Sequence, residues 1–400
     1  MSSITQKSAL PVCFFALMLA PHSGMSGNPG RPILSLYGAI PLMGRILIRA
    51  GMAIVALALA AVLVGLAYRA WRQHEVAQIL AITTADGIDE GSFVRIGGID
   101  QYITIRGDHR SNPVILFVHG GPGDSMVPFA QIYRPWEKYF TVVQWDQRGA
   151  GRTYGRNGKN EAPMTIDCMV RDGIEVSQYL RAHLHKDKIV LLAHSWGSVL
   201  GIQIVKRRPD LFAAYVGTGQ IVAKEEKEEV IYGRLMKQLA AARDTQGATR
   251  LRAVGPPPYR SQHDLMVERE IADRFDVPSE RGLHRELAPV LFYAPNYSLL
   301  YIHHFLKAPE FAGKALYRQQ LPYDARKLGL DFDVPFFLFE GQYDTIAPSD
   351  LAKAYFDSVR APVKGFVVFR NAGHGAIETN SGEFLQALLA HVRPLAVQRN

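Results

Sequence analysis

The sequence predicts an α/β fold with a mainly parallel sheet covered by helices on both faces, and three observations support this prediction. Continuous apolar runs at 113–118, 141–145 and 188–193 are typical of strands that are buried on both faces. Helical patterns alternate with these runs, which favours parallel strands joined by helices. Glycine-rich loops follow the runs, at the carboxyl ends where such sheets place their chemistry.

A membrane-spanning helix is predicted near the N-terminus. Residues 50–68 are nineteen uncharged residues rich in Ala, Leu and Val, bounded by Arg49 and Arg69. This is the length needed to cross a hydrocarbon core of about 30 Å. The alternative is a cleaved signal peptide, but the run is long for one and no small-x-small cleavage site follows it. We expect a signal-anchor at 46–72 that holds the protein to the membrane through 50–68.

The residues before this anchor, 1–45, are expected to form a tail. Met43-Gly44-Arg45 looks like the start of a signal-anchor, so the first 42 residues are either a disordered tail or the result of a mis-assigned start. Arg45 and Arg49 precede the apolar run, and acidic residues follow it at 75, 86, 89 and 90. This asymmetry favours a single-pass protein in which the residues after the helix lie on the extracytoplasmic side.

The net charge of +8 does not indicate a nucleic-acid partner. Residues 1–75 hold six basic residues and one acid, so +5 of the charge lies there and only +3 belongs to the remaining 325 residues. The two cysteines, Cys13 and Cys168, lack metal-site spacing, and no metal is expected.

The chain after the anchor divides into a linker, a core in two parts and an insertion. We expect a linker at 73–90 and the first core part at 91–218. This part begins with a hairpin of 92–96 and 101–105 around Gly97-Gly98. The strands at 113–118 and 141–145 come next. They are followed by a helix at 166–184, the strand at 188–193, a helix to about 208 and a strand at 212–216.

The pattern changes at 219–329, where aromatic residues are irregularly spaced and strand-like runs are few. We expect a mostly helical cap there, with a charged helix at 225–242. The core resumes at 330–400 with a strand at 334–340, a helix at 348–359, a strand at 365–370 and a last helix at 381–391.

The run Ala193-His194-Ser195-Trp196-Gly197 has the pattern of a nucleophile elbow, in which a serine stands on a sharp turn between strand and helix. Small residues two before and two after the serine let the strand and helix pack closely. Here they are Ala193, in place of the usual glycine, and Gly197. The alternative is a buried strand that runs into a helix past an inert serine.

A serine nucleophile needs a histidine to take its proton and an acid to orient that histidine. Asp344 follows the strand at 334–340 and His374 follows the strand at 365–370, so the order is Ser195, Asp344, His374. This is the chain order expected of an α/β-hydrolase.

Other residues compete for these roles. Asp350 is more naturally a helix cap. The alternative histidines are His119, His194 and the pair His303-His304, but only His374 follows the last strand in a glycine-flanked loop.

Two N–H donors are needed for the oxyanion that forms when the serine attacks a carbonyl. We expect the backbone of Trp196, which follows the nucleophile, and of Gly121, in the loop after 113–118. Asp146 and Arg148 are expected to brace loops through a buried ion pair or backbone hydrogen bonds.

Three motifs together resemble the proline iminopeptidase branch of the α/β-hydrolases: 119–123 (HGGPG), 146–152 (DQRGAGR) and 194–198 (HSWGS). The resemblance covers roughly 92–220 and 330–395. It implies a metal-free serine peptidase that removes an N-terminal residue, often proline, with acidic cap residues that hold the substrate's amino group. The sequence departs at Ala193 and lacks the family's acidic cap motif. Glu225 and Glu226 are the substrate-binding candidates, and the alternative for them is a solvated helix face.

The leading hypothesis is a membrane-anchored serine hydrolase of the proline iminopeptidase-like group that acts on a peptide N-terminus, a small amide or an ester without a cofactor. One alternative is an esterase or amidase with the same triad. The other is a catalytically silent protein of this fold that binds a ligand at the membrane.

Overall fold

The computed structural model describes residues 41–158 and 164–397. Its contacts divide the chain into two units, Met1–Gly65 and Leu66–Asn400. The expected tail at 1–45 lies almost wholly outside the described residues.

The described part of the first unit is helical and belongs to α2 (Leu42–Leu80), which continues into the second unit. Its long apolar side chains are exposed, Leu57 to 70% and Val64 to 69% for example. Within the described residues, α2 is the one helix that is long and apolar enough to cross a membrane, by length and composition. The predicted span 46–72 lies inside it.

The predicted linker at 73–90 has more regular structure than expected. Residues 73–80 extend α2, and β1 already begins at Ile88. Helix formers such as Glu75, Ala77 and Gln78 let the helix continue beyond the apolar run. Only the short stretch between α2 and β1 is irregular.

The second unit is built on an eight-stranded sheet with the order β1-β2-β4-β3-β5-β6-β7-β8. The strands are β1 (Ile88–Ile96), β2 (Ile99–Gly107), β3 (Val114–Val118), β4 (Thr141–Trp145), β5 (Ile189–His194), β6 (Phe212–Thr218), β7 (Phe336–Gly341) and β8 (Lys364–Phe369). Only β2 runs against its neighbours, and β4 through β8 are paired in parallel. The predicted mainly parallel α/β fold is therefore confirmed.

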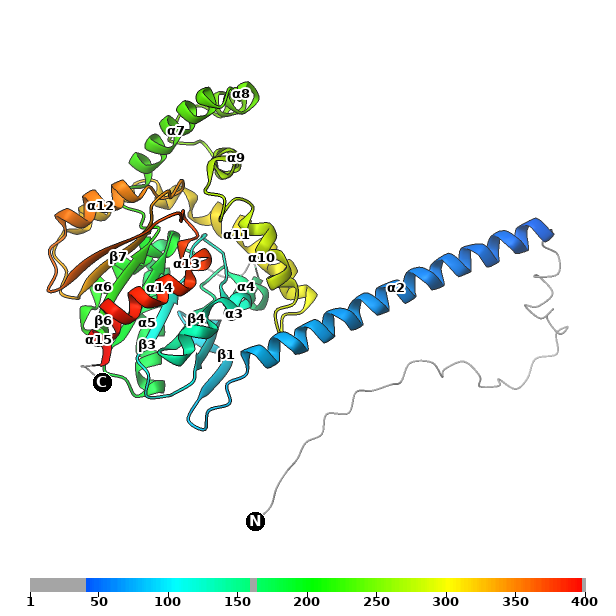
Figure 1. Cartoon of the computed structure of the whole chain (residues 1–400), viewed down its shortest axis with the longest axis horizontal. Helices are drawn as coiled ribbons and strands as arrows, with labels where there is room; N and C mark the ends of the chain where they lie inside the picture. Colours follow the sequence, from blue (N-terminus) through cyan, green and yellow to red (C-terminus); the bar gives the residue numbers. More distant parts are fainter. Residues whose placement is uncertain (1–40, 159–163, 398–400) are drawn as a thin grey trace, which may run out of the picture. The chain divides into compact units, whose positions relative to one another are not determined.

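Helices cover both faces of this sheet (Figure 1). One face packs on α5 (Ile166–Leu184), α6 (Trp196–Arg207) and α12 (Ser349–Ser358). The other packs on η2 (Arg134–Lys138), α14 (Ser381–Ala387), η7 (Leu388–Val392) and α15 (Arg393–Val397). Alternate residues of each strand enter opposite cores, as Leu116 and Phe117 of β3 do. Burial on both faces explains the continuous apolar runs.

A group of helices separates β6 from β7 in the chain and forms a cap (Figure 1). The cap helices are α7 (Lys224–Ala241), α8 (Thr245–Val254), α9 (Gln262–Ala272), α10 (Leu283–Phe292) and α11 (Leu299–Gln320). Ile231, Leu235 and Leu251 belong to a hydrophobic cluster of the cap's own. The segment expected to be a helical insertion, 219–329, is thus helical over most of its length.

Candidate active site

Ser195 lies between β5 and α6. Its backbone has φ of 53° and ψ of −121°, a conformation that residues other than glycine rarely adopt. Such strain at a strand-to-helix turn is typical of a nucleophile elbow. A Cβ atom at position 197 would lie 2.0 Å from the carbonyl oxygen of Val118 and 2.7 Å from that of His119. Glycine is therefore required at 197, because α6 begins directly against the end of β3.

The departure from glycine at Ala193 has a local compensation. The Ala193 side chain is fully buried and faces Gly201, one turn into α6. A Cβ atom at 201 would lie only 2.7 Å from the Ala193 methyl group. Helix α6 thus remains close to strand β5, because Gly201 provides the space that a glycine at position 193 would otherwise provide.

The structure brings Ser195, His374 and Asp344 together at the ends of β5, β8 and β7. His374 Nε2 lies 2.8 Å from Ser195 Oγ, and His374 Nδ1 lies 2.8 Å from Asp344 Oδ2. With Asp344 ionised, Nδ1 carries the proton that it donates to the carboxylate. Nε2 is then free to accept the serine proton.

Asp344 is held as a carboxylate by its surroundings. Its second oxygen, Oδ1, accepts hydrogen bonds from the backbone of Ile346 at 2.7 Å and Ala347 at 2.6 Å. Burial alone would raise the pKa of Asp344, but His374 and the two amides outweigh it and the pKa is lowered. The charged acid required beside a catalytic histidine is therefore favoured.

The loop after β3 lies directly against the nucleophile. A Cβ atom at Gly120 would lie 3.2 Å from Ser195 Cβ, and Gly121 has a positive φ of 111°. His119 braces this loop: its Nε2 accepts from the Gln147 backbone at 3.2 Å, and its Nδ1 donates to the Gly120 carbonyl at 2.9 Å. Burial lowers the pKa of His119 to about 4, so it is neutral at neutral pH.

Asp146 and Arg148 hold neighbouring segments. Asp146 accepts from Ser125 Oγ at 2.5 Å and from the Arg152 backbone at 2.7 Å. Burial raises its pKa to about 6. Arg148 forms a buried ion pair with Asp172 of α5 at 2.9 Å. These are the bracing contacts that the sequence predicts for the two residues.

The competing histidines occupy other places. His194 donates from Nε2 to the His374 carbonyl at 3.1 Å, and burial lowers its pKa to about 3. It therefore supports the histidine loop as a neutral side chain. His303 and His304 lie on α11 of the cap, where the His304 ring contacts Tyr154 edge-on.

Sequence reasoning missed a cap residue that holds the His374 loop. Glu280 is 4% exposed, and its carboxylate accepts from the Gly373 backbone at 2.6 Å and the Gly375 backbone at 2.8 Å. Burial raises its pKa. The only hint in the sequence is a carboxylate in a loop before a helix, which is a common pattern and carries no information about a partner 93 residues away.

The same cap segment touches the acid loop. Asp276 accepts a hydrogen bond from the Thr345 hydroxyl, next to Asp344, and the Ser279 hydroxyl donates to the Asn371 carbonyl at 3.1 Å. Residues 276–280, which we call the cap clamp, therefore contact the loops of both His374 and Asp344.

Glu225 and Glu226, the predicted substrate-binding residues, lie in the first turn of α7. Glu225 is exposed, and Glu226 forms an ion pair with Arg326 at 2.7 Å. The structure joins neither of them to the hydrogen-bonded chain of Ser195.

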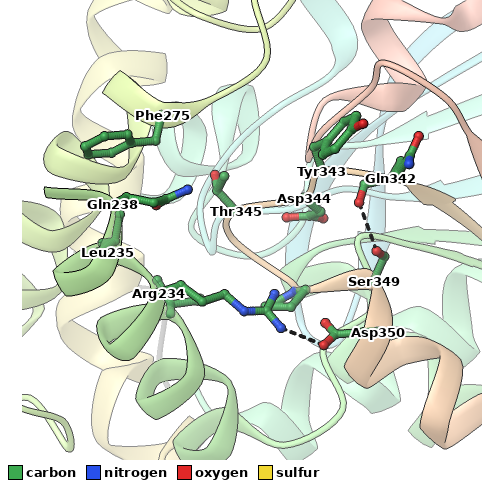
Figure 2. A pocket seen from close by; sticks show the side chains of 12 residues that line it. Arg234, Leu235, Gln238, Phe275, Gln342, Tyr343, Asp344, Thr345, Ser349 and Asp350 are labelled. Atoms are coloured by element: carbon green, nitrogen blue, oxygen red, sulfur yellow. Dashed lines mark hydrogen bonds and ion pairs between the residues drawn. The ribbon is translucent and has the colours of Figure 1, made fainter. Parts of the chain in front are cut away.

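A cavity of about 370 Å³ lies between α7 and the acid loop. Figure 2 shows that Arg234, Gln238 and Phe275 of the cap face the loop 342–350 across it. Arg234 pairs there with Asp350 at 2.5 Å. The expected helix cap, Asp350, lies instead in the first turn of α12, because Pro348 occupies the cap position. Asp344 lines this cavity, whereas Ser195 and His374 do not.

Comparisons with known proteins agree with this architecture. The family described as alpha/beta hydrolase fold matches residues 113–381. A relative from Bacillus subtilis, named probable aminopeptidase YbaC, is 32% identical over 306 residues, which are 74% of this chain and 94% of that protein. The proline iminopeptidase of Saccharolobus solfataricus is 36% identical over 120 residues, 29% of this chain and 35% of that one.

Two solved structures share the fold. One is a bacterial membrane phospholipase A, with a TM-score of 0.58 and 16% identity, over 88% of this chain and 99% of that chain. The other is a proline iminopeptidase-related protein of Thermus thermophilus, with a TM-score of 0.53 and 22% identity, over 77% of this chain and 99% of that one. Because the family match covers residues 113–381 and the three motifs resemble those of the relatives, the chain belongs to the α/β-hydrolase family and is related to the proline iminopeptidases.

Proposed function

We propose that this protein is a membrane-anchored serine hydrolase that acts as a proline iminopeptidase-like aminopeptidase. The observation that carries the proposal is the hydrogen-bonded chain from Ser195 through His374 to Asp344, which starts at a strained elbow. Family membership alone would not do so, because one fold serves many functions.

In the proposed reaction, Ser195 Oγ attacks the carbonyl carbon of the scissile bond while His374 Nε2 takes the hydroxyl proton. Asp344 stabilises the imidazolium that results. His374 then returns the proton to the leaving nitrogen, and the C–N bond breaks to give an acyl-enzyme. Water, deprotonated by the same histidine, attacks the acyl carbonyl carbon. The ester bond to Ser195 then breaks, His374 gives the proton to Ser195 Oγ, and the carboxylic acid product leaves.

The oxyanion of each tetrahedral intermediate is assigned to the backbone N–H groups of Trp196 and Gly121. Trp196 is the first residue of α6, where backbone N–H groups lack partners within the helix. Gly121 follows Gly120, which packs on Ser195. Removal of one such donor typically costs about 10²–10³ in kcat.

Aminopeptidase specificity is supported by the relatives, whose names include a probable aminopeptidase and a proline iminopeptidase. In such an enzyme a carboxylate holds the substrate's charged amino group. We keep Glu225 and Glu226 as the candidates for this task, at the start of α7.

A second candidate function, an esterase or amidase for uncharged substrates, is favoured by a specific observation. The cap carboxylates with assigned partners are already engaged, Glu226 with Arg326 and Glu280 with two backbone amides. A cationic substrate terminus would have to displace such a partner or rely on Glu225, which is exposed to solvent, whereas a neutral ester needs no carboxylate.

Anchoring is supported by the exposed apolar side chains of α2 and by the likeness to a solved structure that is named a membrane phospholipase A. We propose the extracytoplasmic side for the catalytic unit: two arginines flank each end of the apolar run, but acidic residues at 75, 86, 89 and 90 offset those that follow it.

The test uses the full chain in detergent with a fluorophosphonate probe, proline and alanine arylamides, and short aryl esters. We expect the probe to label wild type and the Ser349→Ala control, and not Ser195→Ala. Labelling of Ser195→Ala would mean that the nucleophile is elsewhere. Ester turnover without arylamide turnover would replace the aminopeptidase with the esterase.

A further inference from the structure

The end of α2 that belongs to the second unit is bound to the cap by a buried arginine. Arg69, which ends the uncharged run, is 8% exposed. Its guanidinium donates to the carbonyl of Phe292 at 3.0 Å and to that of Tyr297 at 2.5 Å. One turn later, Gln73 donates to the carbonyl of Ala294 at 2.7 Å. The carbonyls at the end of a helix lack intrahelical partners, and Arg69 supplies one for Phe292, the last residue of α10. The other two contacts hold the loop that follows α10.

Aromatic contacts strengthen the same junction. Tyr68 meets Tyr293 edge-on at 6.2 Å between ring centroids, and the Arg72 guanidinium lies 5.5 Å from the Tyr293 ring centre. Arg69 lies 5.1 Å from the Phe292 ring centre. Residues 66–73 and the loop 292–297 therefore form one packed junction between α2 and the hairpin of α10 and α11.

Exposed apolar side chains are concentrated beside this junction. Among the described residues from 81 onward, ten large hydrophobic side chains are exposed, and four of them lie within 292–306. They are Phe292 (40% exposed), Leu299 (50%), Leu300 (61%) and Leu306 (65%). Leu299 and Leu306 are seven residues apart and share one side of α11. Concentrations of this kind mark interaction surfaces.

The chain itself indicates which partner covers this surface. Residues 66–68 end the uncharged run. The polypeptide therefore leaves the bilayer at this point if it is anchored as proposed. Tyr68, Trp71 and Arg72 are residue types that prefer the interface between lipid and water, and Tyr68 and Trp71 are 51% and 53% exposed. The exposed leucines are therefore connected, through the Arg69 contacts, to the point at which the chain would leave the bilayer.

We propose that the exposed face of the α10–α11 hairpin, made of Phe292, Leu299, Leu300 and Leu306, rests in the headgroup region of the bilayer. This inference depends on the anchoring part of the proposed function and adds a second membrane contact to it. The anchor supplies affinity, and the Arg69 junction keeps the hairpin beside residues 66–73 of the same unit.

The surface is connected to the candidate active site by α11. A Cβ atom at Gly123, in the loop after β3, would lie 2.7 Å from the Ala308 carbonyl oxygen. Phe305 packs edge-on with Phe129, which follows that loop, at 5.9 Å between centroids. The helix that meets the lipid at its first turns thus also packs on the oxyanion loop. Substrates concentrated at the interface, such as amphiphilic esters or lipopeptides, are the class that this arrangement favours.

The test places an environment-sensitive NBD fluorophore on single cysteines in the full chain. The background carries Cys13→Ser and Ser195→Ala, so that the result is independent of catalysis, and Cys168 is buried. Leu300→Cys and Leu306→Cys probe the surface. Val363→Cys and Val368→Cys are matched controls, because these valines are 42% and 46% exposed and lie at or next to β8.

Each variant is reconstituted in phosphatidylcholine vesicles that contain phosphatidylglycerol and, in a parallel sample, a nitroxide-labelled lipid. We expect blue-shifted emission and nitroxide quenching at 300 and 306, with water-like, unquenched emission at 363 and 368. Water-like emission at 300 and 306 in protein that floats with the vesicles would overturn the proposal. Blue-shifted emission that nitroxide lipid does not quench would also overturn the proposal, and would indicate that a second copy of the chain covers this surface. Protein that does not float with the vesicles would refute the membrane anchor and, with it, this proposal. The hydrolase is tested separately, by fluorophosphonate labelling of the chain that retains Ser195.

Discussion

Replacing Glu280 should impair catalysis without removing any group that touches the substrate. Its carboxylate holds the two backbone N–H groups on either side of His374, at 2.6 and 2.8 Å. Glu280→Ala leaves both donors inside the clamp without an acceptor. The loop then loses what fixes His374 between Ser195 and Asp344.

The expected magnitude follows from these contacts. A hydrogen bond to a charged group contributes about 1.5–3 kcal/mol. Losing two would allow the loop to leave its position, and a misplacement of about 1 Å typically costs 10²-fold in rate. We expect kcat to fall about 10²-fold in Glu280→Ala, with KM changed less than about threefold. Glu280→Gln retains one acceptor oxygen and should lose about tenfold, which corresponds to about 1.4 kcal/mol.

The assay measures kcat and KM on an aryl ester across pH, together with thermal unfolding. Because burial raises the pKa of Glu280, its protonation on acidification weakens its hold on the Gly373 and Gly375 amides and contributes to the loss of kcat. The acid limb should therefore be steeper in wild type than in Glu280→Gln. Glu286→Ala, at an exposed position in the first turn of α10, is the control and should keep near-normal kcat. A folded Glu280→Ala with kcat within twofold of wild type would refute the reasoning.

Three further predictions follow from the site. Gly197→Ala places a methyl group 2.0 Å from the Val118 carbonyl oxygen, so urea unfolding should show a loss of about 1–3 kcal/mol, and unchanged stability would contradict the steric argument. Asp344→Asn should lower kcat about 10⁴-fold in a folded protein, because His374 loses the partner that fixes its tautomer, and a loss below tenfold would argue against this role. Burial raises the pKa of Glu378 from 4.5 to about 8, so its contribution to stability is present at low pH and is lost as pH rises through about 8. Urea unfolding between these pH values should show a decline of up to about 1.4 kcal/mol per pH unit that Glu378→Gln removes, and an equal slope in both proteins would exclude Glu378 as its source.

The core could be predicted from the sequence because its signals are local. An apolar run followed by a glycine-rich loop identifies a buried parallel strand and its carboxyl end, and Ser195, Asp344 and His374 each follow such a run. The sequence does not show that the linker begins as a helix, because polar residues such as Gln73 do not reveal a helix that continues beyond an apolar run. In the fold, Gln73 remains helical and donates to a carbonyl of the cap.

The cap clamp could not be predicted for a different reason. Glu280 reaches the Gly373 amide across 93 residues, and nothing in the residues around it records that contact. The same holds for Arg69, whose charge marks the end of an apolar run in the sequence. Only the fold shows that it binds carbonyls more than 220 residues away. Contacts between the cap and the rest of the chain depend on tertiary structure, whereas strand ends are encoded locally.

The facing pair Ala193 and Gly201 has an evolutionary consequence. Close approach of β5 and α6 limits the combined volume of the two side chains, and a methyl group at 201 would also lie 2.9 Å from the Tyr215 ring. Relatives with glycine at the position of Ala193 can therefore accept alanine at the position of Gly201 where the residue that matches Tyr215 leaves room for it, while alanine at both should be avoided. The two positions should vary together in an alignment, and a search pattern that scores them as a pair will find hydrolases that a fixed glycine at the first position excludes.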